Sequence, residues 1–460
     1  MKLVLLSGGS GKRLWPLSNQ VRSKQFLQLL RSPDGEMESM VQRIWRQLDR
    51  QQLRDQVYIS TVQSQADLIQ SQLGSEVPLI IEPESRDTFP SVALAAVYLY
   101  TKQDVDLQEV VVFMPVDPFV QELFFTRINQ LEEIVLRSGT ELALIGVAPT
   151  YPSTKYGYII PDPDQEKGSH TVSYRTVQRF QEKPSEEQAV SLIKKNALWN
   201  CGVFAFQLGY MINLLREKGL PTQYEAFIQG YAQMPKISFD YEVIEKAQRV
   251  VVLPYEGYWK DLGTWNTLTE EMEQQMVGNG FLDENSSNTH LINELELPVA
   301  VIGGSNLVVA VSADGILVSD KAKSHLVKNL TTFTDKRPMY EERRWGWYQV
   351  LHHQKTAEGE EVLTKRLHIQ AGKNLSYQYH HYRSEVWVVV SGKGEFVLDG
   401  HLRMVSPGEV LEIPTGAKHG IRAIEDLDII EVQKGSNLVE EDIVRLCQSW
   451  EEMKASLIQE

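Results

Sequence analysis

The chain has 460 residues, of which 42% are hydrophobic and 23% are charged, a composition typical of a folded protein with more than one domain. Its 46 Lys and Arg against 61 Asp and Glu give a formal net charge of −15. This excess of acid argues against general binding of nucleic acids or anionic membranes, so any phosphate must be held by a local site. The two cysteines, Cys201 and Cys447, exclude a disulfide framework and a cysteine-rich zinc site. No apolar run reaches the ~18–20 residues that span a bilayer, and the N-terminal run lacks the pattern of a signal peptide, so we expect a soluble cytoplasmic chain.

Strand-like and helix-like patterns alternate from the N-terminus to about residue 276. Short apolar or β-rich runs occur at 3–6, 57–60, 79–81, 110–114 and 142–147. Helical patterns lie between them, including those at 38–52 and 91–101. This alternation predicts right-handed βαβ crossovers and an α/β domain over residues 1–276.

The pattern then changes to short β-rich pieces. A polar, turn-rich stretch at 278–288 marks a boundary, and we expect a small β-rich connector over residues 277–335. Short strands separated by turn residues continue to about residue 434 and predict a barrel or sandwich. An amphipathic pattern at 440–457 predicts a helix that closes a third domain over residues 336–460.

A glycine-rich turn follows the first predicted strand. Its glycines are Gly8, Gly9 and Gly11. Such a turn lets backbone N–H groups approach a polyphosphate, and Arg13 and Lys24 could neutralise a departing pyrophosphate. The turn is not a Walker A loop, because Leu6 and Arg13 occupy positions that need Gly and Ser or Thr. It is not a dinucleotide fingerprint either, because Leu14 stands where the third glycine is needed.

The sequence around this turn, Gly-Gly-x-Gly-x-Arg-Leu-x-Pro-Leu-Ser with Lys24 further on, resembles the signature of sugar-1-phosphate nucleotidyltransferases. Trp15 is typical of the mannose-1-phosphate guanylyltransferase branch. Further segments resemble blocks of the same family in the same order: 82–88, 114–117, 156–159, 180–184, 199–202, 238–242 and 259–263. The resemblance covers the whole first domain and implies a Rossmann-like nucleotidyltransferase domain with a mostly parallel sheet.

The resemblance also implies a reaction, in which an oxygen of mannose 1-phosphate attacks the α-phosphorus of GTP to give GDP-mannose and pyrophosphate. Such a transfer depends on positioning and charge neutralisation, so it needs no nucleophilic side chain. The implied catalytic residues are Arg13, Lys24, Asp117 and Asp261, the two aspartates also holding Mg²⁺. The implied nucleotide-binding residues are Gly8, Gly9, Gly11, Arg86 and Asp87. The implied sugar-phosphate residues are Gly157, Glu182, Lys183 and Asn200.

A second constellation lies in the third domain, at Gln378, His380, Glu385 and His419. In a strand, positions 378 and 380 point to one face, and hairpins could bring the other two residues to it. The spacing resembles the paired motifs of a cupin β-barrel, and the Gln-x-His start is similar to mannose-6-phosphate isomerases fused to guanylyltransferases. The resemblance implies that these four residues hold Zn²⁺ or another divalent metal, while Arg445 binds substrate.

The implied second reaction interconverts mannose 6-phosphate and fructose 6-phosphate, which requires a metal to polarise a carbonyl and a base to move a proton. The sequence does not identify the base. Tyr382 and Val386 stand where this family tends to have histidines. In the transferase, Asp87 and Pro118 stand where the family has Asn and His.

These departures leave two alternatives to the bifunctional enzyme. One is a nucleotidyltransferase for a related sugar 1-phosphate with a silent cupin, and the other is a nucleotide-sugar sensor without turnover. Retention of both metal carboxylates disfavours the sensor, because binding alone does not need them. As partners we expect GTP, mannose 1-phosphate and mannose 6-phosphate, no nucleic acid or membrane, and a second copy in a homodimer.

Overall fold

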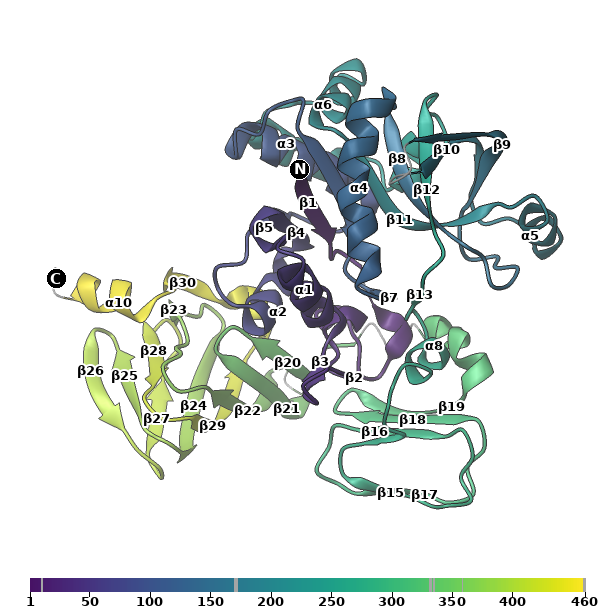
Figure 1. Ribbon diagram of the computed structural model, residues 1–460. Helices are drawn as coiled ribbons and strands as arrows, with labels where there is room; N and C mark the ends of the chain where they lie inside the picture. The colour runs from purple at the N-terminus through teal and green to yellow at the C-terminus, as the bar shows by residue number, and fades with distance from the viewer. Residues whose placement is uncertain (10, 169–172, 331–332, 334–335, 358, 458–460) are drawn as a thin grey trace.

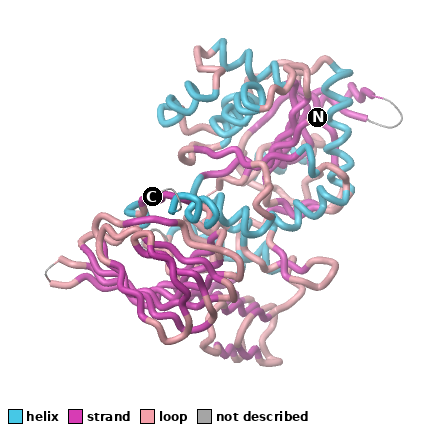
Figure 2. The backbone as a smooth tube through the Cα atoms, turned by 90° about the vertical axis from the view of Figure 1, so that its left-hand side faces the viewer, coloured by secondary structure: helices cyan, strands magenta, loops and turns pink. Residues whose placement is uncertain are grey.

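The computed structural model describes residues 1–9, 11–168, 173–330, 333, 336–357 and 359–457. Ser10 of the glycine turn and Asp335 at the expected domain boundary lie outside the described residues. Three regions follow one another along the chain, and Figure 1 shows an α/β region at the top, a small β region at the lower right and a β-barrel at the lower left. Figure 2 shows the α/β region above both β-rich regions from a second direction.

The α/β region is built on a nine-stranded sheet. Its strands, in spatial order, are β5 (Leu79–Glu82), β4 (Val57–Val62), β1 (Lys2–Leu6), β6 (Val110–Pro115), β11 (Leu198–Gln207), β8 (Leu142–Val147), β12 (Val250–Tyr255), β10 (Ser173–Gln181) and β9 (Tyr158–Gly168). The four strands from β5 to β6 are parallel, as are β8 and β12. However, β11 runs antiparallel to both β6 and β8, and β9 and β10 form an antiparallel hairpin.

The α/β fold is therefore confirmed, but the sheet is mixed rather than mostly parallel. The expectation holds for the half that contains β1, and it is wrong for the half that contains β11. An apolar run reports that a strand is buried on both faces, and this pattern is the same for either strand direction.

Helices cover both faces of this sheet. They are α1 (Met40–Arg50), α2 (Gln63–Leu73), α3 (Thr88–Lys102), α4 (Leu123–Ser138), α5 (Glu186–Ile193), α6 (Leu208–Glu217) and α7 (Tyr224–Gly230). The short helix α8 (Trp265–Thr269) lies below the sheet and packs in an apolar cluster with the connector (Figure 1). The expected helix at 38–52 begins two residues later because Ser39 and Gln42 form a capping box before α1. Among the helices of the described residues, none is both long enough and apolar enough to cross a bilayer.

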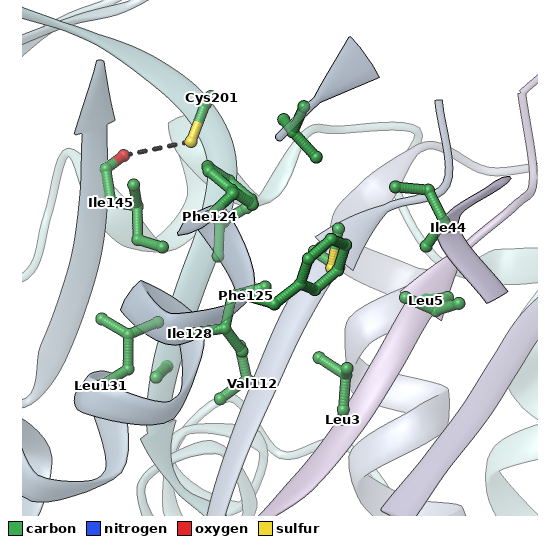
Figure 3. Close-up of a cluster of buried hydrophobic side chains, with 14 of the residues drawn as sticks. Leu3, Leu5, Ile44, Val112, Phe124, Phe125, Ile128, Leu131, Ile145 and Cys201 are labelled. Carbon is green, nitrogen blue, oxygen red and sulfur yellow. Dashed lines mark hydrogen bonds between the residues drawn. The ribbon is translucent and has the colours of Figure 1, made fainter. Parts of the chain in front are cut away.

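The sheet separates two apolar cores, because successive side chains of a strand point to opposite faces. Leu3 and Leu5 of β1 pack with α1 and α4, together with Phe124 and Phe125 (Figure 3). Val4, between them, packs in the second core with α3, α6 and α7. The apolar run that predicts the first strand is therefore buried on both sides.

The middle region consists of short strands that pack beneath the α/β region. They are β14 (Met276–Val277), β15 (Gly280–Leu282), β16 (His290–Asn293), β17 (Val299–Val301), β18 (Leu307–Ser312) and β19 (Gly315–Asp320). Four of them form the sheet β14-β16-β18-β19, and β15 pairs with β17. Val308 and Leu317 pack with Leu14, Trp15 and Trp265 in a shared apolar cluster, so this region supports the chain that follows the glycine turn.

The third region is a barrel of two facing sheets. One sheet contains β20 (Tyr340–Arg343), β21 (Gly346–Lys355), β22 (Glu361–Ile369), β29 (Leu427–Gly435), β24 (Arg383–Ser391) and β27 (Val410–Ile413). The other contains β26 (His401–Val405), β25 (Gly394–Leu398), β28 (His419–Ala423), β23 (Tyr377–Tyr379) and β30 (Val444–Cys447). Side chains of both sheets, including Trp387, Phe396 and Ile421, fill the apolar interior.

The expected helix at 440–457 is only partly present. The helix α10 covers Trp450–Leu457, whereas residues 444–447 form β30 and pair with β23. The amphipathic pattern was misleading here because the free edge of β23 offers hydrogen-bond partners, and tertiary pairing overrides a local periodicity.

Arg22 joins the three regions. Its Nη1 donates to both carboxylate oxygens of Glu294 in the connector, at 2.8 and 3.0 Å. Its Nε lies 3.5 Å from Glu342 of β20, and its guanidinium lies 5.4 Å from the ring centre of Tyr340. We call Arg22, Glu294 and Glu342 the Arg22 clasp. Arg22 is buried, so these partners are needed to offset the cost of burying its charge.

We therefore predict that Arg22→Ala lowers the thermal unfolding midpoint, because it leaves Glu294 facing other acids without its cation. The expected loss is about 2 kcal/mol, below the 3–5 kcal/mol typical of a fully buried pair, since Glu294 keeps some exposure. Arg137→Ala, which removes an exposed partner of Glu133, serves as the control and should change the midpoint very little. Equal midpoints for Arg22→Ala and the wild type would contradict the clasp.

Candidate functional site

A cleft of about 480 Å³ opens where β1 and β6 end. The carboxyl ends of parallel strands are where α/β proteins bind their ligands. The residues expected in the site that line this cleft are Gly9, Gly11, Arg13, Lys24, Asp117, Asn200 and Asp261. The structure thus brings together side chains that are far apart in the sequence.

Lys24 occupies the centre of the cleft between two carboxylates. Its Nζ lies 2.8 Å from Oδ2 of Asp117 and 3.0 Å from Oδ1 of Asp261. The strand β7 (Pro118–Val120) pairs with β13 (Trp259–Asp261) so that Asp261 lies opposite Pro118, next to Asp117. The two aspartates that the resemblance assigns to one metal ion therefore face the same point.

The charged groups in this cleft shift one another's pKa values. Burial would lower the pKa of Lys24, but Asp117 and Asp261 outweigh this effect, and the pKa of Lys24 is raised. Burial would raise the pKa of Asp261, but Lys24 outweighs it, and the pKa of Asp261 is lowered. Lys24 stays an ammonium and Asp261 stays a carboxylate near neutral pH.

The glycine turn packs tightly against its surroundings. A Cβ on Gly11 would lie 2.3 Å from the backbone nitrogen of Lys24, so no larger residue fits there without moving the chain. A Cβ on Gly8 would lie 3.2 Å from Oε1 of Glu82. The glycines therefore let the turn approach the chain that carries Lys24.

A second group of expected residues lies at the sugar-phosphate end. The backbone N–H of Asn200 donates to the carbonyl of Gly157 at 2.8 Å, and its side chain donates to Oδ1 of Asp240 at 2.6 Å. Lys183 Nζ lies 2.8 Å from Oε1 of Glu182. A Cβ on Gly157 would lie 2.4 Å from Oε2 of Glu182. Gly157, Glu182, Lys183 and Asn200 thus form one cluster, to which Asp240 also belongs.

Arg86 and Asp87 are placed differently. Arg86 donates to the carbonyl of Met234 at 2.6 Å and pairs with Glu84 at 2.8 Å. Asp87 caps α3, with Oδ1 accepting from the N–H of Thr88 at 2.7 Å, and its φ is +70°. Among the described residues, the lining of the cleft includes neither of them. Their assignment to nucleotide binding rests on the resemblance alone.

Three further residues belong to this site but are not among those expected from the sequence. Asp240 lies in the block 238–242, which resembles the family but to whose residues the resemblance assigns no role. Ser23 and Gln65 are buried beside the glycine turn. The available signals are that Ser23 precedes Lys24 and that Gln65 follows a parallel strand, β4, whose end faces the cleft edge of the sheet.

The barrel contains a second cluster, formed by His380, Glu385 and His419. Their ligand atoms all lie within 4.8 Å of one another, and all three side chains are buried. His380 Nδ1 lies 3.1 Å from the carbonyl of Asp442, and His419 Nδ1 lies 3.0 Å from that of Ala417. If Nδ1 donates, Nε2 carries the lone pair and faces Glu385. The Nε2 of His380 lies 3.2 Å from Oε1 of Glu385 and that of His419 lies 3.5 Å from Oε2, and neither contact has hydrogen-bond geometry.

This cluster fits a divalent metal, because two orphaned imidazole nitrogens and a carboxylate are a typical donor set for one. Gln378 is paired with His419 in the sheet, and its Oε1 accepts from Ser376 at 2.7 Å. Tyr382 and Val386 are 57% and 38% exposed, so the side chains at these two departures from the family point out of the barrel.

The barrel cavity beside this cluster has a largely charged wall. Arg445 of β30 lies opposite Gln378 in the sheet and lines the cavity, as do Arg343 and Arg383. Asp67 of α2 also lines it and lies 4.0 Å from Arg343. The α/β region therefore contributes one side chain to the wall of the barrel cavity.

The cleft and its surrounding sheet define the first region as a nucleotidyltransferase. Residues 2–276 match the family described as "Nucleotidyl transferase", and the chain belongs to this family. Residues 329–448 match the family described as "Mannose-6-phosphate isomerase C-terminal". The chain thus combines a nucleotidyltransferase domain with an isomerase-like domain.

Curated relatives match both domains together. A mannose-1-phosphate guanylyltransferase of Salmonella montevideo is 30% identical, over 96% of this chain and 98% of its own length. The alginate biosynthesis protein AlgA of Pseudomonas putida is 30% identical, over 96% of this chain and 94% of its own length. A crystal structure of a protein named mannose-1-phosphate geranyltransferase, from Thermus thermophilus, has a TM-score of 0.61 and 28% identity, covering 73% of this chain and 99% of the other.

The carboxyl group of Asp240 should make the stability of the folded state depend on pH. Burial, with Glu182 adding to it, raises the pKa of Asp240 from 3.8 to about 6. The folded state therefore binds more protons than the unfolded state between about pH 4 and 6, so this group makes stability fall as the pH rises through that window. Asp240→Asn keeps an acceptor for Asn200 and should remove this component, so its thermal midpoint should gain on the wild type from pH 4 to pH 7. The exposed Asp55→Asn is the control, and a constant difference between Asp240→Asn and the wild type would refute the assignment.

Proposed function

We propose that the chain is a mannose-1-phosphate guanylyltransferase, which transfers a guanylyl group from GTP to mannose 1-phosphate and releases pyrophosphate. The observation that carries this proposal is the position of Lys24 between Asp117 and Asp261, beside the glycine turn. The curated relatives that span nearly the whole chain support the choice of GTP and mannose.

The charges of the site residues suggest which part of each substrate they bind. The N–H groups of the glycine turn, with Arg13 and Lys24, are suited to hold the β- and γ-phosphates and to stabilise the charge that develops on pyrophosphate. Lys183 and Glu182 are suited to the phosphate and hydroxyls of the sugar, which would bring the attacking phosphate oxygen to the α-phosphorus. Asn200 would hold this end through its bonds to Gly157 and Asp240.

Asp117 and Asp261 fit Mg²⁺, a hard cation that prefers carboxylate oxygens. Each carboxylate has two oxygens, so each can accept from Lys24 through one and hold a cation through the other. The bound ion would supply charge neutralisation at the phosphates that react. Arg86 and Asp87 remain proposed nucleotide contacts.

The test crosses four nucleoside triphosphates with several sugar 1-phosphates and measures pyrophosphate release in the presence of Mg²⁺. We expect the fastest release with GTP and mannose 1-phosphate. Asp261→Asn should lower kcat about 100-fold while GTP affinity changes much less, because the carboxylate acts mainly on charge that develops in the transition state. The exposed Asp104→Asn should behave as the wild type. Absence of pyrophosphate release with every pair would favour a sensor.

We further propose that the barrel interconverts mannose 6-phosphate and fructose 6-phosphate. The cluster of His380, Glu385 and His419 supports this second activity, and Gln378 would complete a four-residue Zn²⁺ site. The bound metal would polarise the sugar carbonyl. Arg445, on the wall of the same cavity, is suited to the sugar phosphate.

Metal analysis tests the barrel site. The wild type should retain about one divalent ion per chain, and His380→Ala should lose it, because two of the donors are buried imidazoles. The exposed His401→Ala should retain the metal. Conversion of mannose 6-phosphate should follow the metal content. If the metal-loaded wild type is as inactive as His380→Ala, the barrel is catalytically silent.

We also propose a homodimer that acts in the cytoplasm, where GTP and sugar phosphates occur together. The connector has several exposed large apolar side chains, which support a second copy as the partner: Phe281, Leu297, Ile302, Ile316 and Val318. Ile316 and Val318 lie on β19, which ends its sheet.

A further inference from the structure

The hydroxyl of Ser23 is the centre of a buried hydrogen-bond network. It donates to the carbonyl of Gly9 at 2.6 Å. It accepts from Nε2 of Gln65 at 2.8 Å and from the backbone N–H of Gly11 at 3.4 Å. A serine hydroxyl has one proton and two lone pairs, so all of its hydrogen-bonding capacity is used.

Gln65 reaches this network from the first turn of α2. Its Nε2 also lies 3.4 Å from the carbonyl of Gly9, and its Oε1 accepts from Thr61 at 3.4 Å. Gln65 is 1% exposed and Ser23 is fully buried, so bulk water does not reach either side chain. The N–H of Gly11 also donates to the carbonyl of Gly9, at 3.1 Å, so Gly9, Gly11, Ser23 and Gln65 share their hydrogen bonds. A buried polar group that loses its partner is costly, so a change at one member affects the others.

The network joins the two parts of the cleft that are suited to hold the phosphates of the nucleotide. Gly9 and Gly11 belong to the turn, whereas Ser23 directly precedes Lys24, the cation between Asp117 and Asp261. Gly11 also packs against the backbone nitrogen of Lys24. Ser23 therefore ties the glycine turn to the stretch of backbone that carries Lys24.

We propose that Ser23 and Gln65 are positioning residues for the triphosphate, which set the spacing between the phosphate-binding turn and Lys24. This inference rests on the proposed nucleotidyltransferase function. Neither residue lines the cleft among the described residues, so both act through Gly9, Gly11 and Lys24. The sugar-phosphate cluster around Glu182 lies on other elements, and the network does not include it.

The test compares Ser23→Ala and Gln65→Met with the wild type. Each variant removes one member of the network with little change in volume. We expect KM for GTP to rise about tenfold or more, while KM for mannose 1-phosphate stays within about twofold. Ser23→Thr, which keeps the hydroxyl, should recover most of the loss. The double variant should be no worse than the poorer single variant, because residues of one network are not additive.

The exposed Gln28→Ala, close to Ser23 in sequence, is the matched control. The thermal midpoint and the metal content of the barrel report on folding, and if Ser23→Ala fails to fold, the nearly isosteric Gln65→Met carries the test. Equal changes in both KM values, or no change in either, would overturn the inference while leaving the transferase intact. If the wild type shows no turnover, equilibrium binding of GTP decides: loss of affinity in both variants supports positioning, and unchanged affinity refutes it.

Discussion

One ammonium group between two carboxylates organises the cleft of this protein. Lys24 follows the glycine turn after β1, Asp117 follows β6, and Asp261 ends β13, so two ion pairs of one ammonium group join three distant segments. Two carboxylates that face one point would repel each other, and the cation offsets this repulsion. In a partly buried cleft the attraction is stronger than it would be in water. The α/β region serves to keep these three groups at the end of its sheet.

Much of the α/β region can be predicted from the sequence, because β1, β4, β6 and β8 are apolar runs bounded by turn residues. The direction of β11 cannot be predicted in this way, since the same pattern suits either orientation. The strand β30 is a different case, because the free edge of β23, far away in the sequence, determines its conformation.

The candidate sites show the same division. Residues with a charge or a glycine at a recognisable spacing, such as Lys24, Asp117 and His380, are predictable because their type carries the chemistry. Ser23 and Asp240 are not, because a serine or an aspartate has many ordinary uses in a chain. Their importance depends on contacts that only the fold creates: Gly9 for Ser23, and Asn200 for Asp240.

The Arg22 clasp has a consequence for the way the chain can be divided. A break after residue 276 would remove Glu294 and Glu342, leaving a guanidinium without its carboxylates. It would also uncover Leu14, Trp15 and Trp265, which pack against the connector. Gene fission at this point would therefore not yield two self-sufficient proteins, and a free-standing descendant of residues 1–276 would need new residues at position 22 and on its underside.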